Sequence, residues 1–237
     1  MKILAIETSA KSISAAVEEN NVILADTYQN IGLTHSCTLM PLIDSMLHTA
    51  GFTIHDIGLI AVANGPGSFT GLRIGVSAAK GLAWTLDVPC CGVSTLLAMA
   101  QNFLCFNGTI VCAMDARRQQ VYNAVFHAEN GALVRNCEDR AISLEDLYEE
   151  LLSNDNQKII VGDGAVLCYN YLISKGVSCL LAPPQLRMQN AAGVALAARK
   201  LSDEGKIVSS RDLVPVYLRL SQAERERLAK GLKITVD

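Results

Sequence analysis

The sequence of 237 residues predicts an α/β protein made of two similar lobes. An apolar run ends on an acidic residue near the start of the chain, at Glu7, and again in the middle, at Asp115. In both places two more strand-like runs follow at hairpin spacing, and helices then alternate with strands. Val125 lies as far beyond Asp115 as Val17 lies beyond Glu7. The order therefore repeats, which indicates an internal duplication of one α/β unit.

Three strands and one helix are predicted at the start of the chain. The strands form a meander over residues 2–7, 12–18 and 21–28. A helix follows over residues 38–50, because apolar residues recur there at the helical period. We expect Thr38 to cap this helix, so that Pro41 falls in the first turn, where its missing N–H has no helical partner. Gly51 supplies the end of the helix.

A strand, a glycine-rich turn and a long helix come next and form the most distinctive stretch of the chain. They cover residues 57–63, 64–67 and 69–86. The glycines fit neither the dinucleotide-binding fingerprint nor a P-loop. Small residues recur in the helix at every fourth position, and they are Gly71, Gly75, Ala79 and Ala83. One face of the helix therefore carries almost no side chain, and another backbone can approach it closely.

The remaining elements alternate between strand and helix. A strand at 90–93 and a helix from the Ser94 cap to about residue 102 complete the first lobe. The second lobe has strands at 110–114, 120–127, 132–134, 158–161 and 178–181, and helices at 143–152, 165–174 and 191–201. We divide the chain into a first lobe of residues 1–107, a second lobe of residues 108–220 and a charged tail of residues 221–237.

Composition narrows the classes of protein that fit this chain. Half of the residues are hydrophobic, which suits large cores or a substantial partner interface. A net charge of −3 argues against a protein that binds nucleic acid on its own, because such binding needs a basic surface. The first apolar run is too short for a secretory signal, and no run is long enough to span a bilayer. The eight cysteines show no C-x-x-C pair or zinc spacing, so we expect a reduced, cytoplasmic protein.

Glu7 and Asp115 are the best-placed candidates for chemistry, because ligands bind beyond the carboxyl ends of strands in α/β proteins. As a pair they could hold a cation against phosphates, as in duplicated actin-like ATPases. The loops after them, residues 8–11 and 116–119, contain no glycine, so their backbones are poorly suited to approach an anion. The alternative is that both acids cap local turns. The residues of this candidate nucleotide cleft are Glu7, Thr8, Ser9, Asp115, Arg117 and Arg118.

No complete catalytic set is visible in the sequence. No two histidines have metalloprotease spacing, and no serine lies in G-x-S-x-G. The stretch Gly162-Asp163-Gly164 could touch a ligand or form a plain strand-to-helix turn. We therefore predict no catalytic residue, no metal site and no cofactor.

Six motifs, in order along the chain, resemble those of the TsaB family, also called YeaZ. They are I-E-T-S at 6–9, T-H-S-x-x-L-x-P at 34–41, G-P-G-S-F-T-G-L-R-I-G at 65–75, M-D-A-R-R-x-x-V-Y at 114–122, G-D-G-A at 162–165 and P-V-Y-L-R at 215–219. The resemblance covers essentially the whole chain. It implies two RNase H-like lobes in the duplicated actin-like fold of sugar kinases, Hsp70 and actin. It also implies a role in making the threonylcarbamoyladenosine next to the anticodon of tRNAs.

The TsaB family is a paralogue of TsaD, the subunit that transfers the threonylcarbamoyl group to tRNA. TsaD carries an H-x-x-x-H metal pair, and the matching positions here are Thr95 and Met99. Where TsaD has an acidic pair in its first loop, this chain has Lys11 and Ser12, and TsaD's glycine-rich motif in the second lobe is missing. The resemblance therefore implies a non-catalytic subunit. Cys37 departs from the family, whose members often have a glutamate there.

The resemblance also implies partners for this chain. TsaD would bind as a heterodimer through helices 38–50 and 69–86, the ATPase TsaE would bind the pair, and tRNA would be met only through the complex. A homodimer through the same helices is expected in isolation. The expected interface residues are His35, Leu39, Leu42, Ile43, Met46, Gly71, Leu72, Gly75, Val76, Ala79, Lys80 and Ala83. The rival hypothesis is an enzyme, either an actin-like-fold ATPase or a metallopeptidase-like protein that uses Glu7 and Asp115.

Overall fold

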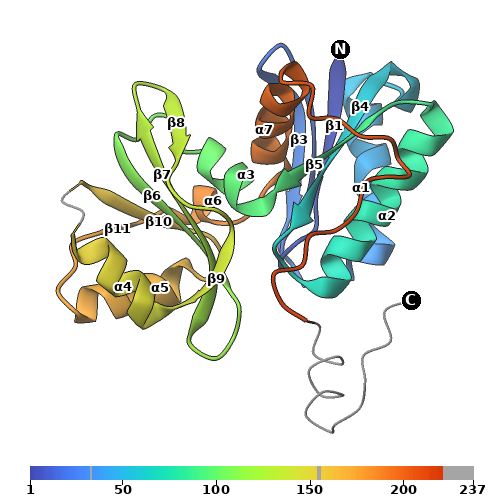
Figure 1. The fold of residues 1–237 in the computed structure, drawn as a ribbon. Coiled ribbons are helices and arrows are strands. Elements are labelled where there is room, and N and C mark those ends of the chain that lie inside the picture. Colours follow the sequence, from blue (N-terminus) through green and yellow to red (C-terminus); the bar gives the residue numbers. More distant parts are fainter. Residues whose placement is uncertain (33, 154–155, 221–237) are drawn as a thin grey trace, which may run out of the picture.

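Two lobes, each built on one mixed sheet, lie side by side in the computed structural model (Figure 1). The structure describes residues 1–32, 34–153 and 156–220. The predicted charged tail, residues 221–237, lies outside the described residues. Helix α3 (Thr95–Gln101) lies between the lobes and contributes buried side chains to the cores of both.

The sheet of the first lobe follows the predicted meander. Its strands are β1 (Lys2–Glu7), β2 (Ile13–Glu19), β3 (Val22–Gln29), β4 (Ile57–Gly65) and β5 (Cys90–Ser94). They lie in the order β3-β2-β1-β4-β5, with β4 and β5 parallel to β1 and the meander antiparallel. Strand β1 is central and is fully buried after its first residue. Ile3 and Ala5 face one core, and Leu4 and Ile6 face the core on the other side of the sheet.

The sheet of the second lobe repeats this order. Its strands are β6 (Gly108–Asp115), β7 (Gln120–Glu129), β8 (Ala132–Arg135), β9 (Arg140–Ser143), β10 (Lys158–Val161) and β11 (Leu180–Leu181). The order β11-β10-β6-β7-β8 matches the first sheet strand for strand, which confirms the predicted duplication. Strand β9, which pairs with β7, was not predicted, and β11 is shorter than the predicted strand at 178–181.

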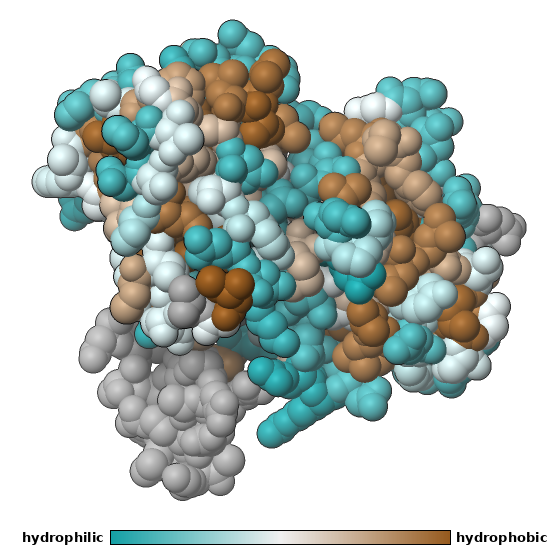
Figure 2. Space-filling view, turned by 180° about the vertical axis from the view of Figure 1, so that it is seen from behind, coloured by the Kyte–Doolittle hydropathy of each residue, from teal (hydrophilic) through white to brown (hydrophobic). Residues whose placement is uncertain are grey.

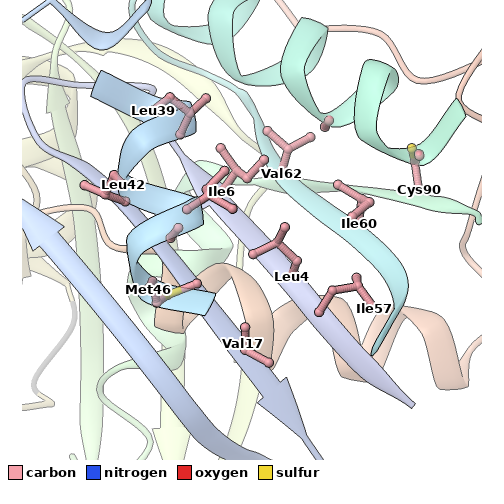
Figure 3. Packing of buried hydrophobic residues seen from close by; sticks show 14 of the residues in the cluster. Leu4, Ile6, Val17, Leu39, Leu42, Met46, Ile57, Ile60, Val62 and Cys90 are labelled. Atoms are coloured by element: carbon pink, nitrogen blue, oxygen red, sulfur yellow. The ribbon is translucent and has the colours of Figure 1, made fainter. Parts of the chain in front are cut away.

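Helices cover both faces of each sheet. In the first lobe, α1 (His35–Ala50) and α2 (Phe69–Leu86) pack on one face, and α3 and α7 (Ala191–Asp203) pack on the other. In the second lobe, α4 (Leu144–Leu152) and α5 (Ala165–Ser174) cover one face, and α3 covers part of the other. The remaining helical turns are η1 (Ile54–Asp56) and α6 (Pro184–Arg187). Figure 3 shows how Leu39, Leu42 and Met46 of α1 point into the core over β1 and β4.

Helix α1 begins earlier than the sequence predicted. Thr34, not Thr38, is its N-cap residue, so Pro41 lies inside the helix rather than in its first turn. The missing N–H of Pro41 leaves the carbonyl of Cys37 without its usual helical donor. Pro41 and Cys37 are both exposed, so water can hydrogen-bond that carbonyl. The prediction was wrong because it used the proline to set the start of the helix, whereas an exposed proline inside the helix costs only one backbone hydrogen bond that water can replace.

Helix α7, predicted as part of the second lobe, packs on the sheet of the first. A Cβ on Gly193 would lie 2.1 Å from the Ala98 carbonyl oxygen, so α7 and α3 are in backbone contact. Arg199 of α7 forms an ion pair with the buried Glu18 of β2, with 2.9 Å between Nη2 and Oε2. A division at residues 108–220 therefore does not follow the packing, because the chain crosses back to the first lobe with α7.

The small-residue face of α2 is in contact with the loop after β1. A Cβ on Gly71 would lie 2.1 Å from the Thr8 carbonyl oxygen, and one on Gly75 would lie 2.3 Å from Thr8 Oγ1. Thr8 Oγ1 also donates a hydrogen bond to the Gly71 carbonyl at 2.8 Å. The helix thus meets the Thr8 backbone at Gly71 and the Thr8 hydroxyl at Gly75 with no helix side chain between them.

We expect Gly71→Ala to lower the free energy of unfolding by about 1–3 kcal/mol, because the added methyl group overlaps a backbone oxygen that cannot rotate away. Gly81→Ala is the matched control in the same helix, since a Cβ there meets nothing within 4 Å. It should leave stability unchanged or raise it by up to about 1 kcal/mol. Urea unfolding of both variants measures the difference, and equal stabilities would contradict the close contact.

Candidate functional site

A cavity of about 450 Å³ opens between the two lobes. It lies where the loops after β1 and β6 meet the start of α2, as expected for an α/β fold in which ligands bind beyond the carboxyl ends of strands. Its lining includes Ser9 and Lys11 from the first loop, and Asp115 and Arg117 from the second. Seen from behind, hydrophilic residues follow the junction of the lobes, while hydrophobic residues gather away from it (Figure 2).

Glu7 lies behind this cavity and not in its lining. Its side chain is completely buried, and its Oε1 accepts a hydrogen bond from the Ser9 N–H at 2.5 Å. Its Oε2 is buried without a hydrogen-bond partner among the described residues. Burial raises the pKa of Glu7 to about 7; the Ser9 hydrogen bonding opposes this shift, and the nearby Asp163 carboxylate adds to it. This carboxyl group therefore keeps its proton at acidic pH and loses it only near neutral pH.

Asp163 approaches Glu7 from the second lobe, on the turn after β10. Burial raises its pKa, and the Asp115 carboxylate adds to that effect, while a hydrogen bond from Gln189 Nε2 at 2.8 Å opposes it. The Gln189 carbonyl in turn accepts a hydrogen bond from the Ser12 hydroxyl at 3.0 Å. The Gly162-Asp163-Gly164 stretch is therefore part of the contact between the lobes as well as a turn.

The other predicted cleft residues separate into two groups. Ser9, Asp115 and Arg117 line the cavity, and Asp115 Oδ1 accepts a hydrogen bond from the Arg117 N–H at 2.7 Å. Thr8 is buried and its hydroxyl is used by α2, while Arg118 is exposed and outside the lining. Asp115 therefore caps its local turn, as the alternative interpretation expected.

The predicted interface residues are mostly buried in the core of this chain. Leu39, Leu42, Ile43, Met46, Gly71, Leu72, Gly75, Val76, Ala79 and Ala83 all face the sheet and the loop of their own lobe. Lys80 Nζ donates to the carbonyls of Arg211 and Leu213, each at 3.0 Å. His35 Nε2 lies 2.9 Å from the Ala10 carbonyl oxygen. A docking surface on these helices must therefore use their outer faces, which the apolar and small-residue pattern does not mark.

Sequence reasoning gave no role to the segment after α7, which the structure brings to the cavity. Residues 207–219, here called the strap, return across the first lobe, and Val216 to Arg219 line the cavity. Tyr217 stacks on Phe69 with 4.0 Å between ring centroids. Arg219 Nη1 donates to the Ala116 carbonyl at 2.7 Å. The P-V-Y-L-R motif at 215–219 was the available signal, but spacing alone does not show which lobe it meets.

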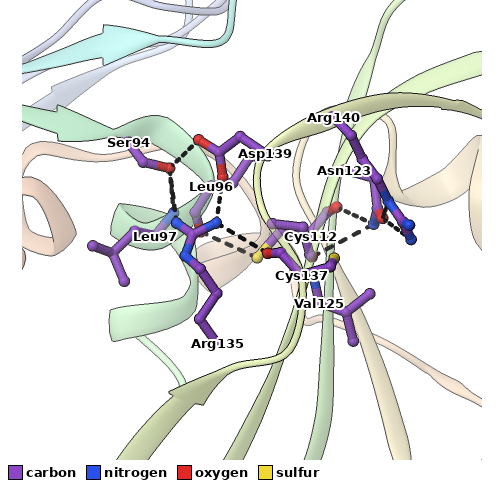
Figure 4. Close-up of polar contacts among 11 residues, drawn as sticks. Ser94, Leu96, Leu97, Cys112, Asn123, Val125, Arg135, Cys137, Asp139 and Arg140 are labelled. Carbon is purple, nitrogen blue, oxygen red and sulfur yellow. Dashed lines mark hydrogen bonds and ion pairs between the residues drawn. The ribbon is translucent and has the colours of Figure 1, made fainter.

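A second polar contact joins the lobes near α3. Ser94, which caps α3, donates its hydroxyl proton to Asp139 Oδ2 at 2.5 Å. Arg135 Nη1 donates to Asp139 Oδ1 at 2.6 Å, and Arg135 Nη2 donates to Ser94 Oγ at 3.3 Å (Figure 4). The end of β5 is thereby tied to the chain between β8 and β9 of the other lobe.

Thr95 and Met99 are both part of α3 and are buried between the lobes. Met99 belongs to the core that α3 shares with β6, and its sulfur lies near the position where a Cβ on Gly162 would be. Among the described residues, no group of three or more histidine, cysteine or acidic side chains could hold a metal ion.

The duplicated sheets, with a cavity between the lobes, define a protein of the actin-like class. The ROK hexokinase of Thermus thermophilus shares this fold with a TM-score of 0.50 at 10% identity, over 86% of this chain and 100% of the hexokinase. A family model described as TsaD, tRNA N6-adenosine threonylcarbamoyltransferase, matches residues 29–225.

Closer relatives specify the family. The tRNA threonylcarbamoyladenosine biosynthesis protein TsaB of Bacillus subtilis is 35% identical over 94% of this chain and 96% of its own length. The structure of YeaZ from Pseudomonas aeruginosa aligns with a TM-score of 0.77 at 25% identity, over 92% of this chain and 99% of YeaZ. This chain belongs to the TsaB (YeaZ) family.

None of the helices in the described residues has the length and apolar character needed to cross a membrane.

We expect Glu7→Gln to change how stability depends on pH. The folded protein keeps the Glu7 proton up to about pH 7, whereas the unfolded chain releases it near the usual value of 4.5. Stability from this group is therefore complete below pH 4.5 and is lost as the pH rises to 7, a loss on the order of 3 kcal/mol. Glutamine keeps the acceptor for Ser9 and carries no charge, so the variant should be more stable than the parent at pH 8.

Urea unfolding between pH 4 and 8 tests this expectation. The gain in stability of Glu7→Gln over the parent should shrink toward zero at the acidic end. Glu149→Gln, at an exposed position of α4, controls for the loss of one carboxylate. A stability difference between Glu7→Gln and the parent that does not vary with pH would show that folding does not raise the pKa of Glu7.

Proposed function

We propose that this chain is a non-catalytic subunit that supports threonylcarbamoyl transfer to the adenosine next to the anticodon of tRNAs. It does so by binding TsaD, and the ATPase TsaE binds the pair. Membership of the TsaB family supports the place in tRNA threonylcarbamoyladenosine biosynthesis. The match to the TsaD family model raises the question of whether this chain is the transferase itself.

The observation that most directly supports the non-catalytic role is the identity and burial of Thr95 and Met99. These positions correspond to the histidine pair of TsaD in the resemblance described above. Here both side chains are buried, Met99 belongs to the core between the lobes, and neither residue lines the cavity. A hydroxyl and a thioether in an apolar core are poor ligands for a hard cation.

The positions of the two acids also support this role over an ATPase or a metallopeptidase-like enzyme. A carboxylate pair that holds a cation against a substrate must reach the substrate with both members. Asp115 is exposed at the cavity, but Glu7 is enclosed behind it and holds a proton up to about pH 7. A protonated, enclosed carboxyl group is unsuited to bind a metal–nucleotide complex.

We place the TsaD-binding surface on the outer faces of α1 and α2. The two helices are in contact and cover the same face of the sheet, so their outer faces form one surface. Asp44 and His48 of α1 and Ser77 of α2 are exposed there, and Trp84 is 77% exposed. On α2 the small exposed residues Ser77 and Gly81 lie on the same stretch of helix as Trp84, and small residues beside one large aromatic residue suit close packing of helices around an anchor. The homodimer expected in isolation would use the same surface and would compete with TsaD.

Modification of tRNA should require this chain together with TsaD. Purified TsaD and TsaE of the same organism, with a tRNA substrate, threonine, bicarbonate and ATP and the enzyme that makes the adenylate donor, should give modified tRNA only when this chain is added. Mass spectrometry of the digested tRNA measures the product. Full modification without this chain would refute the proposed role, whereas modification by this chain without TsaD would show that it is the transferase.

Gly81→Arg should weaken TsaD binding about a hundredfold or more, because a long charged side chain would hold the two helix surfaces apart. A Cβ at Gly81 meets nothing within 4 Å, so the variant should fold normally. Asn170→Arg, at an exposed position of α5 in the second lobe, is the matched control and should bind like the parent. Calorimetry gives both affinities, and parent-like binding by folded Gly81→Arg would move the docking surface elsewhere.

A further inference from the structure

The strap lies along the first lobe through backbone contacts over most of its length (Figure 1). Val208 exchanges two hydrogen bonds of 2.8 Å with Cys90 of β5. Farther along, Asn64 Nδ2 donates to the Val214 carbonyl at 3.1 Å, and the Val216 N–H donates to the Asn64 carbonyl at 2.7 Å. The strap is thus held on the first lobe as far as the cavity.

The backbone of the strap is pressed against the end of β4. A Cβ on Gly65 would lie 2.1 Å from the Val216 carbonyl oxygen, and Gly65 has a φ of +140°, which side chains disfavour. Because Gly65 has no side chain, the strap can cross the end of β4 in direct backbone contact. The backbone of the first lobe therefore fixes the position of the strap.

Tyr217 fixes the strap to α2. Its ring stacks on Phe69 at 4.0 Å with 16° between the ring planes, and its hydroxyl accepts a hydrogen bond from Arg73 Nε at 3.1 Å. The Arg73 guanidinium lies 4.3 Å from the centre of the Phe69 ring on the same helix. Stacked rings with a neighbouring cation give a directional contact that is stronger than apolar burial alone.

Arg219 fixes the next part of the chain to the second lobe. Its Nη1 donates to the Ala116 carbonyl at 2.7 Å, and its guanidinium lies 6.0 Å from the centre of the Tyr122 ring. Arg219 follows Tyr217 by two residues, which span about 7 Å in an extended chain. The two lobes are therefore joined across the mouth of the cavity by a short piece of chain.

We propose that Tyr217 and Arg219 form a latch that holds the mouth of the cleft between the lobes closed. Each end of the latch contacts a different lobe. Tyr217 orients the chain from which Arg219 reaches the second lobe, so the loss of either side chain weakens the closure of the mouth. The contact of Ser94 with Asp139 and the contact of Gln189 with Asp163 remain in place when the latch opens. When the latch opens, the lobes therefore rotate apart at the mouth and expose its loops, while they stay joined at these two contacts. This inference does not depend on the proposed function.

Hydrogen exchange of the full chain, followed by mass spectrometry, tests the latch. Arg219→Ala removes the grip on the second lobe, and it should speed exchange about tenfold or more in the loop of the first lobe at residues 8–12, which Arg219 does not touch. Tyr217→Ala removes the stacking on Phe69 that orients Arg219, and it should also speed exchange in the loop of the second lobe at residues 115–119. The double variant should exchange no faster than either single variant.

Two independent contacts would give a different pattern from a latch. If Arg219→Ala affects only residues 115–119, Tyr217→Ala affects only the first lobe, and the two effects add, the latch is refuted. Arg211→Ala is the matched control, because Arg211 is an exposed arginine of the same strap whose side chain has no hydrogen bond or ion pair within the described residues. Exchange in Arg211→Ala that equals that of Arg219→Ala would also refute the latch.

Scattering gives a second measurement that does not depend on the exchange of individual amides. The radius of gyration from small-angle X-ray scattering should be larger in Arg219→Ala than in the parent and in Arg211→Ala. Equal radii in all three proteins, with parent-like exchange at residues 8–12, would show that the lobes keep their orientation without the latch.

Discussion

The backbone contact between α2 and the loop after β1 is the constraint on which the rest of the structure depends. Gly71 and Gly75 bring the helix onto Thr8 with no side chain between them. This contact closes the loop over Glu7 and sets the direction in which α2 leaves the sheet. It also turns the outer residues of α2 to the surface and puts Phe69, at the start of the helix, at the mouth of the cleft. The two glycines thus set the positions of Glu7, of the outer face of α2 and of Phe69, on which the strap packs.

The same contact explains why Glu7 is buried beneath the loop and does not line the cavity. A loop that packs on a helix backbone removes water from the residue beneath it, and burial disfavours the ionised carboxylate. Burial therefore raises the pKa of Glu7 to about 7, and the free energy of unfolding is lower at higher pH, where the buried group must ionise. In an enzyme that binds a metal and a nucleotide, the loop would have to stand open over the acid. Here the closed loop makes Glu7 part of the packing between the lobes, together with Asp163 and Gln189.

The sequence predicts the duplication well, because the strands and their succession along the chain follow from short-range patterns such as the acid-ended strands at Glu7 and Asp115. The side of α2 that meets a partner could not be predicted in the same way. Periodicity shows that Gly71, Gly75, Ala79 and Ala83 share a face, but it cannot distinguish a contact with the chain's own loop from a contact with another protein. The placement of α7 and of the strap depends on pairs such as Glu18 with Arg199, which lie 181 residues apart and leave no local pattern.

Helix α2 is the element at which docking and lobe orientation meet. Its inner face rests on the loop at Thr8, and its edge holds the strap through Lys80 and Arg73. Ser77 and Gly81 on its outer face are exposed. A helix held on two sides can shift only if those contacts shift with it. A partner that binds the outer face and moves α2 must therefore act on the strap, and through Arg219 on the second lobe. If the latch and the docking surface are both as proposed, the orientation of the lobes is set jointly by the chain's own strap and by its partner, and the two effects are reciprocal.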